Sequence, residues 1–164
     1  MPLDYVPSFR QAVGADIPSM SRIRLSVTEN VLSDPSRVTL AMYEDYLEAA
    51  GRGWVAAIDG AVAGFCYADR NDGSIWALFV SPEHEGRGLA RRLLALALDW
   101  LFALGHHEAR LTTTADTRAD RFYARQGWQR SILSPVEVEY TLAQDSAGAH
   151  CARLEAAGLV DHAA

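Results

Sequence analysis

The chain has 164 residues, of which 49% are hydrophobic and 22% are charged, a balance typical of one globular domain and not of a disordered chain. Its formal net charge of −6 excludes a broad surface for nucleic acid. All 15 basic residues are arginines, which excludes a Schiff-base lysine, a lysine tether for pyridoxal phosphate and the lysine of a P-loop. The two cysteines, Cys66 and Cys151, lie far apart in the sequence, so we expect neither a thiolate zinc site nor another metal.

The N-terminus and the most apolar segment bear on where the protein resides. The first residues, MPLDYVPSF, lack the basic start and apolar run of a signal peptide. Residues 93–104 are too few to span a membrane, and they include Asp99. We therefore expect a cytoplasmic protein without a membrane partner. One domain is expected over residues 1–142, followed by a C-terminal extension over residues 143–164.

The first half of the chain predicts one strand, two helices and three further strands. Apolar and polar residues alternate over 9–13, which indicates a strand, and Asp16 can cap a helix that continues to Val27. A second helix is expected over 40–47, ended by Gly51 and Gly53. Two turn sequences, Asp59-Gly60 and Asn71-Asp72-Gly73, then separate three strands expected over 54–58, 62–68 and 75–80.

The second half predicts two helices and three strands. Residues 89–104 are apolar on most sides, which is typical of a buried helix. The remaining expected elements are a strand over 109–114, a helix over 117–126 closed by Gly127, and strands over 128–133 and 136–142. A strand, helix and strand in succession favour parallel strands. The order β-α-α-β-β-β-α-β-α-β-β indicates a mixed α/β fold with a central sheet and helices on both faces.

The junction between the strand at 75–80 and the helix at 89–104 carries the clearest chemical signal. Gly86 and Gly88 let the backbone turn with N–H groups pointing inward, at the start of a helix. Such a nest binds phosphate groups. Arg87, Arg91 and Arg92 place forked cationic donors around it. The pattern GxGxxG is absent, because Arg91 stands where its third glycine would be.

Two segments resemble the GCN5-related N-acetyltransferases (the GNAT superfamily). Glu85-Gly86-Arg87-Gly88-Leu89-Ala90 resembles that family's Gln/Arg-x-x-Gly-x-Gly/Ala signature, and residues 119–128 resemble its A-x-x-F-Y-x-x-x-G-F/W segment. The resemblance covers about residues 9–142 and implies a GNAT-type fold that binds acetyl-CoA as co-substrate. The residues that it implies for coenzyme binding are Leu78, Phe79, Val80, Glu85, Gly86, Arg87, Gly88, Leu89, Ala90, Arg91, Asp116 and Tyr123.

Two of these positions depart from the family pattern. Glu85 stands where Gln or Arg is usual, and a carboxylate near a pyrophosphate is repulsive unless it points away. Asp116 stands where Asn is usual, although Asp can still cap the following helix. The strand Leu78-Phe79-Val80 resembles the family's bulged strand, whose backbone binds the pantetheine arm.

The resemblance also implies catalytic and substrate-binding residues. It places Tyr123 beside the coenzyme sulfur, where a phenol can act as general acid for the leaving thiolate. The strand at 75–78 has no carboxylate, so the general base stays open among Asp69, Asp72, Glu29 and His84. The acceptor site is implied between the first two helices and the three-strand segment. It would include Glu29, Asn30, Tyr67 and Trp76.

These expectations combine into one function and its alternatives. The implied activity is transfer of an acetyl or other short acyl group from its coenzyme A thioester to an amine, by direct attack in a ternary complex. The acceptor would be a small molecule or a peptide amine, and family members are commonly homodimers. One alternative is a non-catalytic module that binds acyl-CoA as a sensor or interaction domain. Another is a nucleotide-binding domain that uses the same phosphate loop.

Overall fold

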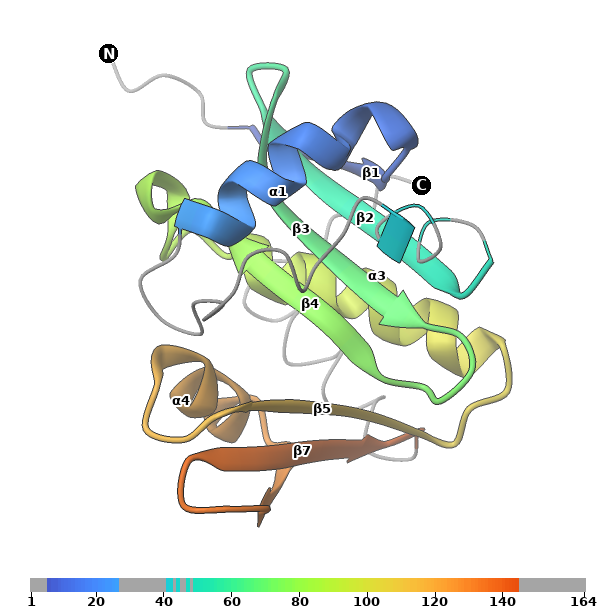
Figure 1. Ribbon diagram of the computed structural model, residues 1–164, viewed down its shortest axis with the longest axis vertical. Helices are drawn as coiled ribbons and strands as arrows, with labels where there is room; N and C mark the ends of the chain where they lie inside the picture. The colour runs from blue at the N-terminus through green and yellow to red at the C-terminus, as the bar shows by residue number, and fades with distance from the viewer. Residues whose placement is uncertain (1–5, 27–40, 43, 45–46, 48, 145–164) are drawn as a thin grey trace.

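The computed structural model describes residues 6–26, 41–42, 44, 47 and 49–144 (Figure 1). Within these residues the strands form two antiparallel sheets. The first contains, in spatial order, β1 (Ser8–Gln11), β2 (Gly51–Ile58), β3 (Ala61–Asp69) and β4 (Ile75–Val80). The second contains β5 (Glu108–Thr114), β7 (Glu137–Ala143) and β6 (Gln129–Ile132). The helices are η1 (Gly14–Asp16), α1 (Ile17–Ser26), η3 (Pro82–His84), α3 (Leu89–Ala103) and α4 (Arg118–Arg125).

The predicted mixed α/β architecture is confirmed, with helices on both faces of the first sheet. Figure 1 shows α1 on one face and α3 on the other. β3 is buried continuously from Ala63 to Ala68 between these two layers, which explains why its sequence is an apolar run without alternation. Met20 belongs to the core on the α1 side, and Leu93 and Leu98 belong to the core on the α3 side.

The predicted turns agree with the structure, whereas one predicted helix end is wrong. Asp59 and Gly60 both have positive φ angles, 52° and 81°, as a two-residue hairpin requires. Gly51 and Gly53, expected to end a helix, instead belong to β2. A Cβ atom on Gly53 would lie 2.8 Å from the ring of buried Tyr67, so this glycine serves close packing between strands. Of the helix expected at 40–47, residues 41, 42, 44 and 47 are described, and all four are helical.

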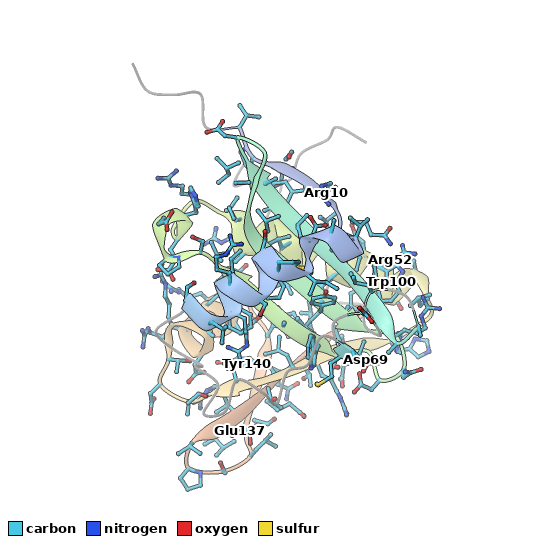
Figure 2. All side chains as sticks on the ribbon, turned by 45° about the horizontal axis from the view of Figure 1, so that its top comes forward. Arg10, Arg52, Asp69, Trp100, Glu137 and Tyr140 are labelled. Carbon is cyan, nitrogen blue, oxygen red and sulfur yellow. The ribbon has the colours of Figure 1, made fainter. Side chains whose placement is uncertain are left out.

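Within the described residues, one isolated bridge links the edges of the two sheets, which then diverge. Ser74 and Arg110 form an isolated parallel bridge, which agrees with the parallel orientation expected from the intervening helix. Beyond that bridge β4 and β5 diverge toward α4 (Figure 1). At the opposite end of the molecule, Arg52 from β2 lies over the ring of Trp100 from α3, 5.2 Å from its centroid (Figure 2). No helix in the described part of the chain is long and apolar enough to cross a membrane.

Candidate coenzyme site

A cavity of about 770 Å³ opens where β4 and β5 diverge. Three segments line it: the end of β4, the loop that leads into α3, and one face of α4. Its lining residues are Leu78, Phe79, Val80, His84, Glu85, Gly86, Arg87, Gly88, Leu89, Ala90, Arg91, Arg118, Ala119, Phe122, Tyr123, Arg125 and Gln126. Every residue expected to bind the coenzyme lines this cavity, except Asp116.

The end of β4 contributes a backbone edge. Leu78, Phe79 and Val80 pair with β3 on one side, and in the described part of the chain no strand pairs with their other side. An extended ligand can use such an edge as a neighbouring strand would. The expected irregularity of this strand is present, but it lies at Trp76. Tyr67 pairs with Ala77 and Ala68 pairs with Ile75, so Trp76 is the extra residue.

The loop after β4 has the backbone geometry of an anion-binding nest. Gly86 and Gly88 have φ angles of 76° and 81°, in the left-handed region that favours glycine. Gly88 is also the N-cap of α3, so the positive end of the helix dipole lies beside the loop. Arg87 and Arg91 line the same wall of the cavity. This wall can therefore hold a phosphate by N–H groups, helix dipole and guanidinium groups together.

The α4 wall contains the residues that the sequence reasoning missed. Arg118, Phe122 and Arg125 line the cavity from this helix, and their spacing of four and then three residues places them on one helical face. That spacing was the available signal. From the sequence alone, this spacing does not identify a cavity wall, because the sequence does not show that α4 faces the loop after β4. Arg118 Nη1 donates a hydrogen bond to Glu85 Oε2 in that loop.

Tyr123 lies at the buried end of this wall. Its side chain is almost fully buried, and its ring contacts those of Phe122, Trp128 and Tyr140, with centroids 5.0, 5.4 and 5.5 Å away. Burial raises the pKa of the Tyr123 hydroxyl. The neutral phenol therefore persists through the physiological pH range, with a proton that it can donate.

Asp116 does not occupy the place expected for it. The N-cap of α4 is Thr117, whose Oγ1 accepts a hydrogen bond from the N–H of Asp120. Asp116 precedes it with a φ angle of 64°, and its own N–H donates to Asp120 Oδ2 at 2.9 Å. Its exposed side chain lies outside the cavity lining. The expectation that Asp116 caps the N-terminus of α4 is therefore wrong.

Asp120 anchors α4 to the second sheet, which the sequence reasoning did not anticipate. Its buried carboxylate accepts two hydrogen bonds from Arg130 of β6, at 2.9 and 3.0 Å. It also accepts one from the hydroxyl of Tyr140 of β7. The hydrogen bonds from Arg130, ahead of that from Tyr140, hold the pKa of Asp120 well below its usual range. This network positions the helix that carries Arg118 and Tyr123.

The structure shows which of the candidate general bases lie in the cavity. The carboxylates of Asp69 and Asp72 accept backbone N–H groups within the β3–β4 turn, and neither lines the cavity. Glu29 lies outside the described residues. Among the described candidates, His84 is the one that lines the cavity.

The expected acceptor residues lie on the α1 side of the first sheet. Tyr67 is fully buried, and its ring meets that of half-buried Trp76 at 5.4 Å between centroids. Both belong to the core that α1 covers. Asn30, like Glu29, lies outside the described residues, so the structure brings together two of the four expected positions.

Comparisons with known proteins place this architecture in one family. The sequence model of the Acetyltransferase (GNAT) family matches residues 18–128. An uncharacterized N-acetyltransferase of Archaeoglobus fulgidus is 36% identical over an alignment 86 residues long, which covers 46% of this chain and 58% of that protein. This match therefore spans little more than half the length of that relative.

Two solved structures share the fold. PaiA N-acetyltransferase of Thermoplasma acidophilum, in complex with coenzyme A, has a TM-score of 0.72 at 13% identity, covering 84% of this chain and 99% of its own. An acetyltransferase of Salmonella typhimurium with acetyl-CoA, YncA, has a TM-score of 0.67 at 19% identity, covering 84% and 94%. With more than half of its length matched by the family's sequence model, the chain belongs to the acetyltransferase (GNAT) family.

Proposed function

We propose that this protein transfers an acetyl or other short acyl group from its coenzyme A thioester to an amine. The observation that carries the proposal is the cavity itself. It joins an edge of β4 that pairs with no described strand, a loop with two left-handed glycines, and arginines from two helices. Membership of the GNAT family supports the reaction class, and two relatives by fold hold coenzyme A or acetyl-CoA.

The residues that line the cavity fit the parts of the coenzyme. Gly86, Gly88 and Arg87 would hold its phosphates through backbone N–H groups and a guanidinium group. The edge of β4 at Leu78–Val80 would bind its extended amide-containing arm. Bound acetyl-CoA supplies an activated thioester.

Catalysis would depend on orientation and on two kinds of hydrogen bond. Backbone N–H groups along β4 would hold the thioester carbonyl oxygen, and the hydroxyl of Tyr123 would donate to the departing sulfur. An ordinary thiol has a pKa of about 8.5, and a phenol has a pKa of about 10. Because the pKa of Tyr123 is raised above that of an ordinary phenol, Tyr123 would donate a hydrogen bond to the coenzyme thiolate and would not transfer its proton completely. His84 is the candidate base.

Cys66 supports direct attack by the amine without a covalent enzyme intermediate. It is fully buried in the core between β3 and α3, and burial raises the pKa of its thiol. The thiolate is the nucleophilic form of cysteine, so this residue is a poor acyl acceptor.

Release of coenzyme A thiol from acetyl-CoA tests the proposal directly. The purified chain would be mixed with acetyl-CoA and panels of polyamines, amino acids, aminoglycosides and peptides with an unblocked N-terminus. We expect amine-dependent thiol release with at least one class, together with the acetylated amine by mass spectrometry. Tight coenzyme A binding with no turnover on any panel would instead indicate the non-catalytic acyl-CoA-binding module.

Substituting Gly86 by valine should weaken coenzyme A binding about tenfold or more. A valine held at this positive φ angle costs roughly 1–3 kcal/mol. If the loop instead changes its φ angle to avoid this strain, its backbone N–H groups no longer point into the cavity. A Cβ on Gly86 would meet no atom within 4 Å, so the substitution acts through the backbone. Isothermal titration with coenzyme A measures the loss.

Gly60 provides the matched control for this substitution. It has a φ angle of 81°, a Cβ there would also meet no atom within 4 Å, and it lies in the β2–β3 turn. Gly60→Val should lower the free energy of unfolding by an amount similar to Gly86→Val while leaving coenzyme A affinity unchanged. Equal affinity losses in both variants would argue against a phosphate site at Gly86.

A further inference from the structure

Glu85 and Arg118 form an ion pair that joins two walls of the cavity. Arg118 Nη1 donates to Glu85 Oε2, which connects the loop after β4 to the first turn of α4. Both residues line the cavity. Their side chains are partly exposed, 57% for Arg118 and 36% for Glu85. The pair therefore lies at the accessible rim of the loop that contains Gly86.

Glu85 is a negatively charged residue among positively charged neighbours. Arg87, Arg91 and Arg125 also line the cavity, and Glu85 is the one carboxylate among the described lining residues. An exposed ion pair adds little to fold stability, because water screens the charges and ordering two long side chains costs entropy. Stability alone is therefore a weak reason for an acid at this position.

The chemistry of arginine suggests what the pair does. A guanidinium group has five N–H donors in a planar fork, so it can donate to a carboxylate and to a phosphate at the same time. A long side chain loses rotamer entropy when a ligand orders it, and a contact that orders it beforehand reduces this cost. Without Arg118, the Glu85 carboxylate would repel the phosphates bound in the same cavity.

We propose that Glu85 and Arg118 act as one unit, in which Glu85 is a positioning residue that holds the Arg118 guanidinium toward the phosphates of the coenzyme. Glu85, the acid at the first position of the phosphate-loop signature, then favours coenzyme binding indirectly, by orienting Arg118 on α4. This inference rests on the proposed function, since it requires coenzyme A in the cavity.

Four proteins test the proposal by isothermal titration with coenzyme A: the wild type, Glu85→Gln, Arg118→Ala and the double variant. Loss of Arg118 should weaken binding about tenfold, as expected for removal of a charge-assisted hydrogen bond. Glu85→Gln should weaken binding about fivefold, because a neutral amide holds a guanidinium less firmly than a carboxylate does. In the Arg118→Ala background the same Glu85→Gln change should strengthen binding, since it removes an unpaired negative charge.

The sign of the Glu85→Gln effect decides the outcome. If this change strengthens coenzyme A binding in both backgrounds, Glu85 simply repels the phosphates, and the proposal is wrong. If it has no effect in either background, the pair plays no part in binding, and the proposal is also wrong. If the wild type itself fails to bind coenzyme A, the proposed function fails, and the inference falls with it.

Two controls isolate the phosphates as the target. Arg121→Ala removes the same charge from α4 at an exposed position outside the cavity lining, and it should leave coenzyme A affinity unchanged. Pantetheine contains the thiol arm without any phosphate, so its affinity, measured by competition, should be the same in all four proteins. A change in pantetheine affinity that matches the change for coenzyme A would contradict a phosphate contact by Arg118.

Discussion

Replacing Tyr123 by phenylalanine should lower kcat about a hundredfold, the loss typical of removing one donor to a charge that develops in the transition state. Coenzyme A affinity and the free energy of unfolding should change little, because phenylalanine retains the ring that packs against Trp128 and Tyr140. Steady-state thiol release at saturating acetyl-CoA measures kcat, and titration with coenzyme A measures affinity. Since burial raises the pKa of Tyr123, the fold-loss should be constant from about pH 6 to pH 9.

The same substitution in the neighbouring ring provides the control. Tyr140→Phe removes a hydroxyl that bonds Asp120 and that lies outside the cavity lining. It should lower the free energy of unfolding, and it should leave kcat nearly unchanged because the two hydrogen bonds from Arg130 still hold Asp120 and α4 in place. An unchanged kcat in Tyr123→Phe would remove Tyr123 from the mechanism. A fold-loss that disappeared at high pH would instead indicate that the tyrosine ionises there.

Replacing Asp120 by alanine should lower the free energy of unfolding by about 3 kcal/mol at pH 7, since its buried carboxylate accepts several charge-assisted hydrogen bonds. The change leaves the buried Tyr140 hydroxyl without its side-chain acceptor and removes the hydrogen bonds between α4 and Arg130 of β6. Denaturant unfolding, followed by tryptophan fluorescence, measures the loss.

The pH dependence of this effect has a defined sign. Because the folded-state pKa of Asp120 lies well below its usual range, its contribution to stability is complete above the unfolded-state value of about 3.9. The contribution is lost as the pH falls through the folded-state pKa. The stability difference between wild type and Asp120→Ala should therefore be constant from pH 5 to pH 7 and shrink below about pH 4.

Glu83→Ala is the matched control for Asp120→Ala. Glu83 is an exposed acid in η3 that lies outside the cavity lining, so its loss should change the free energy of unfolding by less than about 0.5 kcal/mol. A difference between wild type and Asp120→Ala that stayed unchanged below pH 4 would show that the carboxylate charge is not the source of the stability.

Much of the fold could be predicted because its signals are local. The strand Ile75–Val80 has the predicted bounds, and the helix Leu89–Ala103 ends one residue before its predicted end. Both follow from apolar runs bounded by turn residues. Gly53 shows where local reasoning fails. Its sequence context favours a helix end, yet its role is to admit the ring of Tyr67 from a neighbouring strand, a contact that only the folded sheet creates.

The loop side of the candidate site was predictable for the same reason, and the α4 side was not. Gly86, Arg87 and Gly88 are consecutive in sequence, so their common wall could be expected. Arg118 contacts Glu85 across 33 positions, and no local pattern reports such a contact. Asp120 looks in sequence like an ordinary acid in the first turn of a helix. Its partners on β6 and β7 become apparent only when the second sheet is assembled.

Thermal unfolding with and without ligand tests most directly whether the cavity binds coenzyme A. The midpoint would be measured for the protein alone and with coenzyme A, acetyl-CoA or ATP. A ligand present at about 100 times its Kd stabilises the folded state by roughly 2.7 kcal/mol, a shift of several degrees. Our account predicts such a shift with both coenzyme A species and none with ATP. No shift with either coenzyme A species, or an equal shift with ATP, would contradict it.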